Sequence, residues 1–338
     1  MGSCETFPDD AMQSEAPVRH ELLVSSVRPL ISNFLETIDY APPENPDKGA
    51  LRALMLEYAS TSGVPYNKDR HARQCFVTGL SVASDMYPSH PLDVQLHIGI
   101  FTWLGFLIDD TNKQLASDLA SFQPRFYTGQ AQPSLLLDHF ARTLRDTYRF
   151  YDPVVANFIV LSALAFVNAN ALETRNEFQE LVPLKAGVNW PYYFRDKEGL
   201  PEVYAYFTFP RVLYPDIGSF LQAIPDMGRF INLTNDILSF YKEEVAGETR
   251  NYMNSRASYD RKTAMTTMKE VVQETAQSYL RATSVLSRRQ PYAQAWHEYV
   301  MGYVAMHIMN DRYMFADIGL AEHFPGIETN NGDMGVIV

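Results

Sequence analysis

Cysteine is scarce in this chain of 338 residues, and the signature motifs of several large enzyme classes are missing. The two cysteines, Cys4 and Cys75, cannot build a disulfide framework, so we expect a reducing compartment. The sequence has no glycine-rich phosphate loop ahead of a Lys-Ser/Thr pair, no dinucleotide-binding fingerprint, no nucleophile elbow and no His-Glu-x-x-His motif. Enzymes built on those four motifs are therefore set aside. The eight histidines are scattered, and we interpret the two in apolar stretches, His97 and His307, as core residues rather than metal ligands.

Positive charge is also in short supply, with 28 lysines and arginines against 40 aspartates and glutamates and a net charge of −12. So acidic a chain does not suit a nucleic-acid backbone, and we expect no nucleic-acid partner. A phosphate ligand would need a few local basic residues, with metal ions supplying further positive charge. The longest apolar run, residues 98–108, is about half a membrane span, and residues 1–17 lack the apolar segment of a signal peptide. We expect a cytoplasmic protein with no membrane span.

Apolar residues recur at helical spacing along most of the chain, whereas the alternating patterns of strands are missing. The pattern predicts an all-α fold with one core over residues 19–320. A flexible segment is expected before it, at residues 1–18, and a loose tail after it, at residues 321–338. Helices are predicted over residues 19–38, 51–59, 72–86, 92–108, 115–122, 135–151, 154–172, 227–245, 261–285 and 293–316.

A polar stripe interrupts an otherwise apolar helical segment near residue 240. Asn235, Ser239 and Glu243 are spaced at i, i+4 and i+8, so on a helix they lie within about 80° of one another. Their amide, hydroxyl and carboxylate oxygens suit Mg²⁺ that takes further ligands from water and a phosphate. Lys242 lies on the same side, where its ammonium can meet that phosphate. A solvated surface face is the alternative, but the flanking residues are too apolar for it.

A carboxylate pair, Asp109 and Asp110, directly follows an apolar predicted helix. The alternative interpretation is that Asp110 or Thr111 caps the next helix. Together with the polar stripe, however, the pair offers a second wall for a site with two or three Mg²⁺ ions. A polyphosphate would lie between the two walls.

Two arginines in aromatic surroundings are candidate phosphate ligands. Arg312, followed by Tyr313, lies near the end of the last predicted helix. A guanidinium suits bidentate phosphate recognition, and a phenol can donate a further hydrogen bond. Arg195 follows an aromatic stretch. The alternatives are an ordinary surface pair for the first arginine and a snorkelling side chain for the second.

These segments resemble the class I terpene cyclases, and among them the fungal trichodiene-synthase-like group, over roughly residues 20–320. The polar stripe, with Asp236, matches the metal motif Asn-Asp-x-x-Ser-x-x-x-Glu, and the arginine-tyrosine pair is similar to the C-terminal signature of the group. The carboxylate pair takes the place of the aspartate-rich motif. Arg195 matches through its Trp-Pro neighbours and Gly199. One position departs from the pattern, because Lys113 stands where the group carries a third acidic residue, and lysine does not bind Mg²⁺.

The resemblance implies a single-domain isoprenoid-synthase helical bundle around a central hydrophobic cavity. It implies a lyase, a sesquiterpene cyclase that ionises farnesyl diphosphate with three Mg²⁺ ions, cyclises the carbocation and releases diphosphate. Cation–π contacts would stabilise the migrating charge. The implied metal ligands are Asp109, Asn235, Ser239 and Glu243; the diphosphate ligands are Arg195, Lys242, Arg312 and Tyr313; and Asp110 has a supporting role. The candidate pocket-lining aromatics are Phe101, Trp103, Phe106, Tyr192, Trp296, Tyr299 and Tyr303.

Other interpretations stay open at this point. A cyclase for another chain length would share every motif. A chain-elongating prenyltransferase would need a second aspartate-rich motif where the polar stripe stands. A diphosphate hydrolase would need a wetter pocket, and a non-catalytic helical protein has only Lys113 in its favour. A homodimer is also left open.

Overall fold

The structure, a computed structural model, describes residues 10–44 and 46–320. Of the segment predicted to be flexible, residues 10–18 form part of a helix, whereas residues 1–9 and the predicted tail, residues 321–338, lie outside the described residues. Every regular element in the described ranges is helical, which confirms the predicted all-α fold. The α-helices are α1 (Asp10–Thr37), α2 (Gly49–Ser62), α3 (Arg70–Asp85), α4 (Leu92–Asp110), α5 (Ala116–Thr128), α6 (Leu135–Asp146), α7 (Pro153–Glu173), α8 (Asn176–Gln179), α9 (Trp190–Glu198), α10 (Pro201–Phe207), α11 (Ile224–Ala246), α12 (Tyr252–Asp260), α13 (Ala264–Leu286) and α14 (Gln290–Met309). The described ranges also contain the 3₁₀ turns η1 (Thr147–Arg149), η2 (Lys185–Gly187) and η3 (Ile217–Ser219), which lie between helices, and η4 (Asp311–Tyr313), which follows α14.

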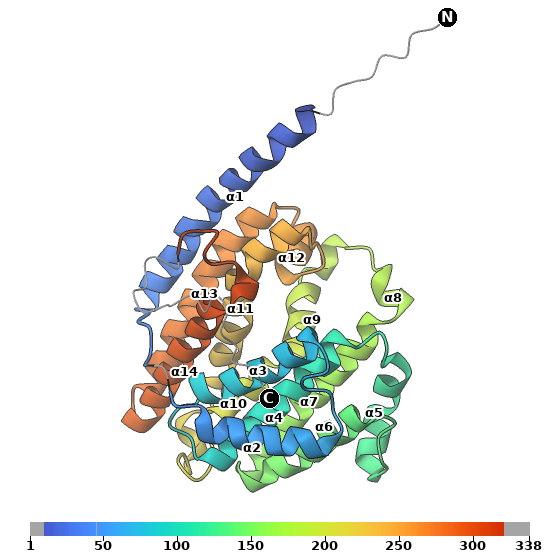
Figure 1. The fold of residues 1–338 in the computed structure, drawn as a ribbon. Coiled ribbons are helices and arrows are strands. Elements are labelled where there is room, and N and C mark those ends of the chain that lie inside the picture. The colour runs from blue at the N-terminus through green and yellow to red at the C-terminus, as the bar shows by residue number, and fades with distance from the viewer. Residues whose placement is uncertain (1–9, 45, 321–338) are drawn as a thin grey trace, which may run out of the picture.

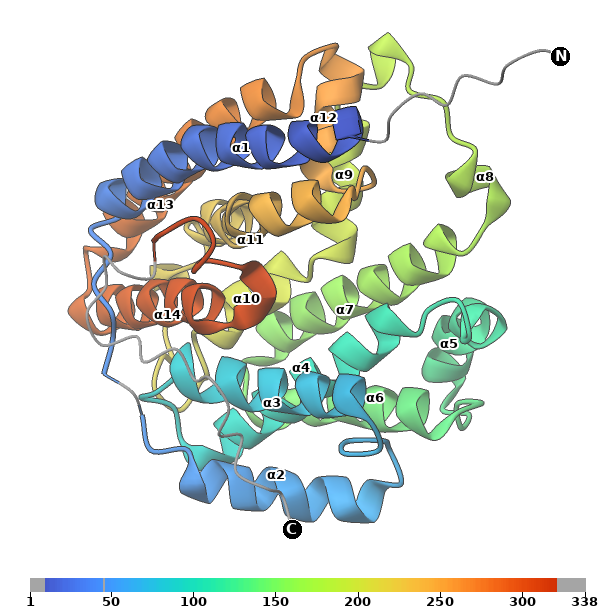
Figure 2. The ribbon, with the colours of Figure 1, turned by 45° about the horizontal axis from the view of Figure 1, so that its top comes forward.

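Helices α4 and α11 run inside the bundle, whereas α1, α2 and α5 lie on its outside (Figures 1 and 2). Helix α4 packs against α3 and α6, and α11 packs against α10 and α13. Buried apolar side chains from Val27 to Leu320 form one connected core. The two helices that carry the predicted acidic motifs are therefore held by neighbours along their length.

The crossing of α3 and α4 is unusually close because glycines meet there. A Cβ atom on Gly79 would lie 2.6 Å from the carbonyl oxygen of Gly99, a distance that side-chain carbons do not tolerate. Gly79 is therefore required for the two backbones to approach. This contact fixes the position of α3 relative to the helix that ends in the carboxylate pair.

The prediction of one helix through residue 316 is wrong, because α14 ends at Met309. Asn310 leaves helical geometry with φ −95° and ψ 115°, and its side chain accepts a hydrogen bond of 3.0 Å from the backbone amide of Arg312. The chain then makes the 3₁₀ turn η4. Arg312 and Tyr313 consequently lie in a turn after the helix rather than on its surface.

Other predicted boundaries are also wrong: α1 starts at Asp10 rather than at residue 19, and α6 ends at Asp146 rather than at residue 151. Two more differences have an identifiable cause. Helix α5 continues through Pro124 to Thr128, with Leu119 and Phe122 buried on its inner face. The helix predicted to start at residue 261 starts at Ala264, because Arg261 takes a φ of 57° and ends α12. Packing in the first case and a left-handed residue in the second override the apolar periodicity.

Helices α4 and α7 are long and apolar enough to cross a membrane by length and composition alone. In the most apolar window of each, 67% of α4 and 56% of α7 is buried inside the fold. Core helices of globular proteins meet the same test, so these two helices are weak evidence for a membrane span.

Candidate active site

A cavity of about 380 Å³ opens between α4, α7, α9, α11 and α14, a size within the usual range for small-molecule sites. Polar residues line the part of the cavity near the carboxyl-terminal ends of α4 and α11, where Asp109 and Glu243 lie. Its apolar lining comes from earlier turns of the same helices and from neighbouring ones. The apolar and aromatic residues that line it include Val82, Met86, Phe106, Phe166, Leu200, Tyr204, Ile231, Tyr299, Tyr303 and Met306.

The structure brings the whole polar stripe of α11 to this cavity. Ser239 and Glu243 are buried and Asn235 is partly buried, and all three side chains line the cavity. The Ser239 hydroxyl oxygen is buried and has no hydrogen-bond partner. A buried hydroxyl without a partner costs free energy, so this oxygen is available to a ligand at modest cost.

A hydrogen-bond chain fixes the amide of Asn235. Because the carbonyl oxygen of Tyr303 can only accept, His307 donates from Nδ1 across 2.8 Å, which leaves its Nε2 as an acceptor. That nitrogen accepts from Nδ2 of Asn235 across 3.0 Å. Burial lowers the pKa of His307 to about 4, so the ring stays neutral and keeps this role. The amide oxygen Oδ1 of Asn235 is thereby turned away from His307 and accepts from Arg195 across 3.2 Å.

Arg195 is buried and anchored to α11 rather than snorkelling to solvent. Its Nε donates to Oδ1 of Asp236 across 2.8 Å, and its Nη1 lies 3.8 Å from a carboxylate oxygen of Glu198. Burial raises the pKa of Asp236 to about 6 even though the arginine opposes that shift, and the second carboxylate oxygen of Asp236 has no partner. The guanidinium is thus held at the cavity by a pair that the sequence did not reveal.

The carboxylate pair occupies the last turn of α4, and Leu115 stands at the N-cap of α5, so the alternative that Asp110 or Thr111 caps the next helix is wrong. Asp109 lines the cavity and Asp110 does not. Asp109 remains accessible from the cavity. Protein atoms around it and the neighbouring Asp110 nevertheless raise its pKa to about 6, with Arg195 and Arg312 opposing. Asp110 turns toward α3, where its carboxylate lies 3.6 Å from the imidazole of His71. In the part of the chain that the structure describes, no ion pair joins Asp110 to Arg312.

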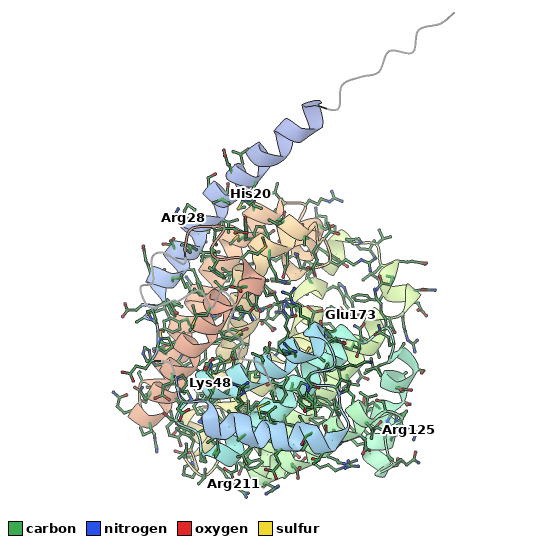
Figure 3. The ribbon with its side chains drawn as sticks, viewed as in Figure 1. His20, Arg28, Lys48, Arg125, Glu173 and Arg211 are labelled. Carbon is green, nitrogen blue, oxygen red and sulfur yellow. The ribbon has the colours of Figure 1, made fainter. Side chains whose placement is uncertain are left out.

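A second acidic group, missed by the sequence analysis, lies beside Asp109. Glu173, at the end of α7 (Figure 3), accepts a hydrogen bond of 3.0 Å from Asn112. Burial and Asp109 raise its pKa to about 7, with Asn112 and Lys113 opposing. Lys113 itself is exposed and does not line the cavity. Because Glu173 comes from a different helix, no local spacing in the sequence could have found it.

Three other predicted diphosphate ligands, Lys242, Arg312 and Tyr313, also line the cavity. The Lys242 ammonium lies 3.4 Å from Glu243 and 5.9 Å from the ring centre of Tyr313. Tyr313 is buried and packs on His307, whereas Arg312 is exposed. The turn after α14 therefore brings both of its residues to the polar part of the cavity.

The aromatic candidates divide into two groups. Phe106, Tyr299 and Tyr303 line the cavity, and Tyr204, which the sequence analysis left out of the candidates, joins them. The structure places the other candidates away from it: Phe101, Trp103 and Trp296 are buried in helix packing, and Tyr192 lies under the guanidinium of Arg229. Helical spacing alone does not reveal which buried aromatics face a cavity and which face a neighbouring helix.

The donor set fits magnesium. Asp109, Asn235, Ser239 and Glu243 offer only oxygen, the Ser239 oxygen lacks a partner, and all four line one cavity. The carboxyl-terminal ends of α4 and α11 add partial negative charge at the same place. A bound cation would offset the negative charge of Asp109, Glu243 and the helix ends, and would give the Ser239 hydroxyl oxygen a partner.

Comparison with solved structures identifies the class of fold as that of class I terpene synthases. The structure of linalool/nerolidol synthase from Streptomyces clavuligerus in complex with 2-fluorogeranyl diphosphate aligns with a TM-score of 0.60, over 79% of this chain and 96% of that chain. At 16% sequence identity, this likeness shows the fold alone.

Sequence comparison then gives the family. The family model described as Trichodiene synthase matches residues 70–324, and the chain belongs to this family. Terpene synthase BipA of Cochliobolus sativus is 42% identical over 314 residues, 92% of this chain and 95% of that protein. Longiborneol synthase of Gibberella zeae is 34% identical over 304 residues, 89% of this chain and 90% of that protein. The chain is therefore an enzyme, a terpene synthase of the lyase class. Terpene synthases act on prenyl diphosphates and generally use Mg²⁺.

Proposed function

We propose that this enzyme is a magnesium-dependent sesquiterpene cyclase that ionises farnesyl diphosphate and cyclises the resulting carbocation. One observation carries the proposal. The oxygen stripe of α11, with the unpartnered Ser239 hydroxyl, and Asp109 of α4 line a single cavity that also has basic residues at its polar end and an apolar, aromatic part. The choice of a fifteen-carbon substrate follows the resemblance to the trichodiene-synthase-like group. We also propose that the enzyme works in the cytoplasm.

The charges around the cavity explain why a diphosphate would need metal ions. Loss of hydration among the surrounding protein atoms raises the pKa values of Asp109, Glu173, Glu198 and Asp236 to between about 6 and 8, so the cavity does not favour further negative charge. A diphosphate without bound metal ions would be repelled by these groups. Bound to Asp109 and to the polar stripe, Mg²⁺ would neutralise the diphosphate and withdraw electrons from the breaking carbon–oxygen bond.

The basic residues would then orient the diphosphate. Arg195 is preorganised by Asp236, Lys242 lies beside Glu243, and Arg312 projects from η4. Their N–H groups and the Tyr313 hydroxyl would donate to the diphosphate oxygens as negative charge develops there. We further propose that Asp110 pairs with Arg312 once the ligand draws the two walls together.

The apolar lining would protect the carbocation. Phe106, Tyr204, Tyr299 and Tyr303 present aromatic groups to the cavity, and their cation–π attraction is worth about 2 kcal/mol or more in a desolvated site. Burial raises the pKa of Tyr204 to about 12, so its phenol stays neutral at physiological pH. No side chain in this lining stands out as the base, and the departing diphosphate would accept the final proton.

Gas chromatography with mass spectrometry of products tests this function. The full-length protein would be incubated with Mg²⁺ and with the ten-, fifteen- or twenty-carbon prenyl diphosphate. We expect a cyclic fifteen-carbon hydrocarbon or alcohol to form fastest, and no product without a divalent ion. Exclusively linear alcohol would indicate a hydrolase, and faster turnover of another chain length would contradict the sesquiterpene assignment.

A further inference from the structure

Three side chains with metal-binding atoms meet on the outer side of the α4 terminus. His71 and Cys75 are one turn apart on α3, and Asp110 reaches them from the end of α4. The Cys75 sulfur lies 3.7 Å from Nε2 of His71 and 3.6 Å from Oδ2 of Asp110. The third edge of the triangle, from Nε2 of His71 to Oδ2 of Asp110, is also 3.6 Å. The three atoms thus form a nearly equilateral triangle.

The two edges that involve sulfur have the length of sulfur hydrogen bonds, with the Cys75 thiol donating to Asp110, and the third edge has the length expected between two ligands of one metal ion. A nitrogen–oxygen hydrogen bond spans about 2.7–3.2 Å, so the 3.6 Å between His71 and Asp110 is too long for one. In tetrahedral zinc coordination, bonds of about 2.3 Å to sulfur and 2.0–2.2 Å to nitrogen and oxygen place neighbouring ligand atoms roughly 3.4–3.6 Å apart. The observed edges, 3.6–3.7 Å, lie at or 0.1 Å above the upper end of this range, so a small inward movement would seat an ion.

We propose that His71, Cys75 and Asp110 form a binding site for Zn²⁺ or a similar transition-metal ion, separate from the proposed magnesium site. Thiolate and imidazole ligands select such ions over Mg²⁺, whereas the all-oxygen set in the cavity has the opposite preference. Three protein ligands leave a fourth position for water. The His71 side chain is 47% exposed, which gives an ion access to the buried Cys75 sulfur.

The scaffold holds these ligands in place before an ion arrives. Asp69 caps α3 by accepting from the Ala72 amide across 2.8 Å, which fixes the first turn that carries His71. The close crossing at Gly79 fixes α3 against α4. Binding would replace the thiol proton of Cys75, which would leave to solvent as the sulfur–metal bond forms.

An ion at this second site would also affect the role of Asp110 in closure, a consequence that rests on the proposed function. Coordination of an ion together with His71 and Cys75 would fix the carboxylate of Asp110 against α3. An ion at this second site would therefore hold Asp110 away from the cavity and oppose the closure proposed above.

Titration of the metal-free, full-length protein with Co²⁺ tests the site independently of turnover. Cobalt accepts the ligands of Zn²⁺, and a bound thiolate gives a charge-transfer band in the near ultraviolet. Cys75→Ser and His71→Gln each remove one ligand, and because His71 is about half exposed we expect its replacement to have little effect on folding. His297→Gln, which changes an exposed histidine on α14, and Cys4→Ser, which changes the other cysteine, are matched controls.

We expect the wild type and both controls to bind one equivalent of Co²⁺ and to show a thiolate band. Added Zn²⁺ should abolish the band by displacing the cobalt. Excess Mg²⁺ should leave the band unchanged. Both ligand variants should lose the band and bind at least about 10- to 100-fold more weakly, since even the loss of an outer hydrogen-bond partner has an effect of that size. A wild type without a thiolate band would overturn the proposal, as would unchanged affinity in His71→Gln.

Discussion

The two acidic walls of the cavity are built differently. On α11, hydrogen bonds to His307 and Arg195 orient the side chain of Asn235, and Ser239 is buried. On α4, the two carboxylates sit exposed at the very end of the helix, and only Asp109 faces the cavity. The α11 wall is therefore preorganised by hydrogen bonds, whereas on the α4 wall the exposed carboxylate side chains can reorient toward a ligand on a helix that is itself held in place. A site that must open, close and exclude water benefits from one wall of each kind.

The largest effect should come from the α11 wall. Replacing Glu243 with alanine removes a buried carboxylate that the proposed metal site needs, and should lower Mg²⁺-dependent turnover at least about 100-fold. Product formation from farnesyl diphosphate measures the loss, and circular dichroism should show unchanged helicity. Asn235→Ala should behave alike. Near-normal turnover in Glu243→Ala would remove the basis for the metal site.

Breaking the buried pair of Arg195 and Asp236, which anchors the same wall, should have a large effect on the free energy of unfolding. Arg195→Met leaves Asp236 buried without its partner, which should lower the free energy of unfolding by about 3–5 kcal/mol. Urea unfolding measures this, and the double variant with Asp236→Leu should recover most of the loss. Arg289→Ala, which breaks the exposed pair with Asp216, is the control and should lose less than about 1 kcal/mol. Equal losses in the two single variants would contradict a structural anchor.

The two carboxylates of the α4 wall should contribute unequally to turnover. Asp109→Ala should lower turnover about 100-fold, because Asp109 is the carboxylate of the pair that lines the cavity. Asp110→Ala should lower turnover less than about tenfold and mainly broaden the product mixture, because its proposed role is in closure. Steady-state kinetics with product profiling compares them. The reverse order would show that the assignment of the pair is inverted.

The uncompensated charge between the walls should make stability depend on pH. Burial raises the pKa of Glu198 to about 8 from its ordinary 4.5, although Arg195 opposes the shift. The folded protein therefore takes up a proton at Glu198 below about pH 8, whereas the unfolded chain does so only near pH 4.5. The free energy of unfolding of the metal-free protein should rise as the pH falls from 9 to 6. Urea unfolding of Glu198→Gln should show a smaller rise, and an unchanged slope would exclude Glu198 as a source.

The smallest effect should come from the position where the α4 wall departs from the family pattern. Lys113 is exposed and outside the cavity lining, so Lys113→Asp should keep turnover or raise it modestly, by less than about threefold. Lys113→Ala is the matched control for removal of the positive charge. Loss of activity in either variant would mean that Lys113 contacts the diphosphate directly.

The same contrast explains what the sequence can predict. The α11 wall lies within nine residues of one helix, so its spacing alone indicates its face and its chemistry. The contacts that prepare this wall come from elsewhere: His307 from α14 and Arg195 from α9. Such partners depend on how helices pack, which local periodicity does not encode.

The remaining misses have the same origin. Glu173 reaches the cavity from α7, and Tyr204 from α10, without any spacing that relates them to the acidic motifs. The break after α14 depends on the side chain of Asn310, which accepts from the Arg312 amide instead of continuing the helix. The all-α class, in contrast, follows from apolar spacing repeated along the chain, and the structure confirms it.

Calorimetric titration with inorganic diphosphate tests the central claim, that both walls bind one metal–diphosphate group. The wild type should bind diphosphate only when Mg²⁺ is present, and Asp109→Ala and Glu243→Ala should each weaken binding at least about tenfold. Phe158→Ala, which changes an exposed aromatic on α7, is the control and should bind like the wild type. Equally tight binding without Mg²⁺, or binding unaffected by both wall variants, would contradict the account.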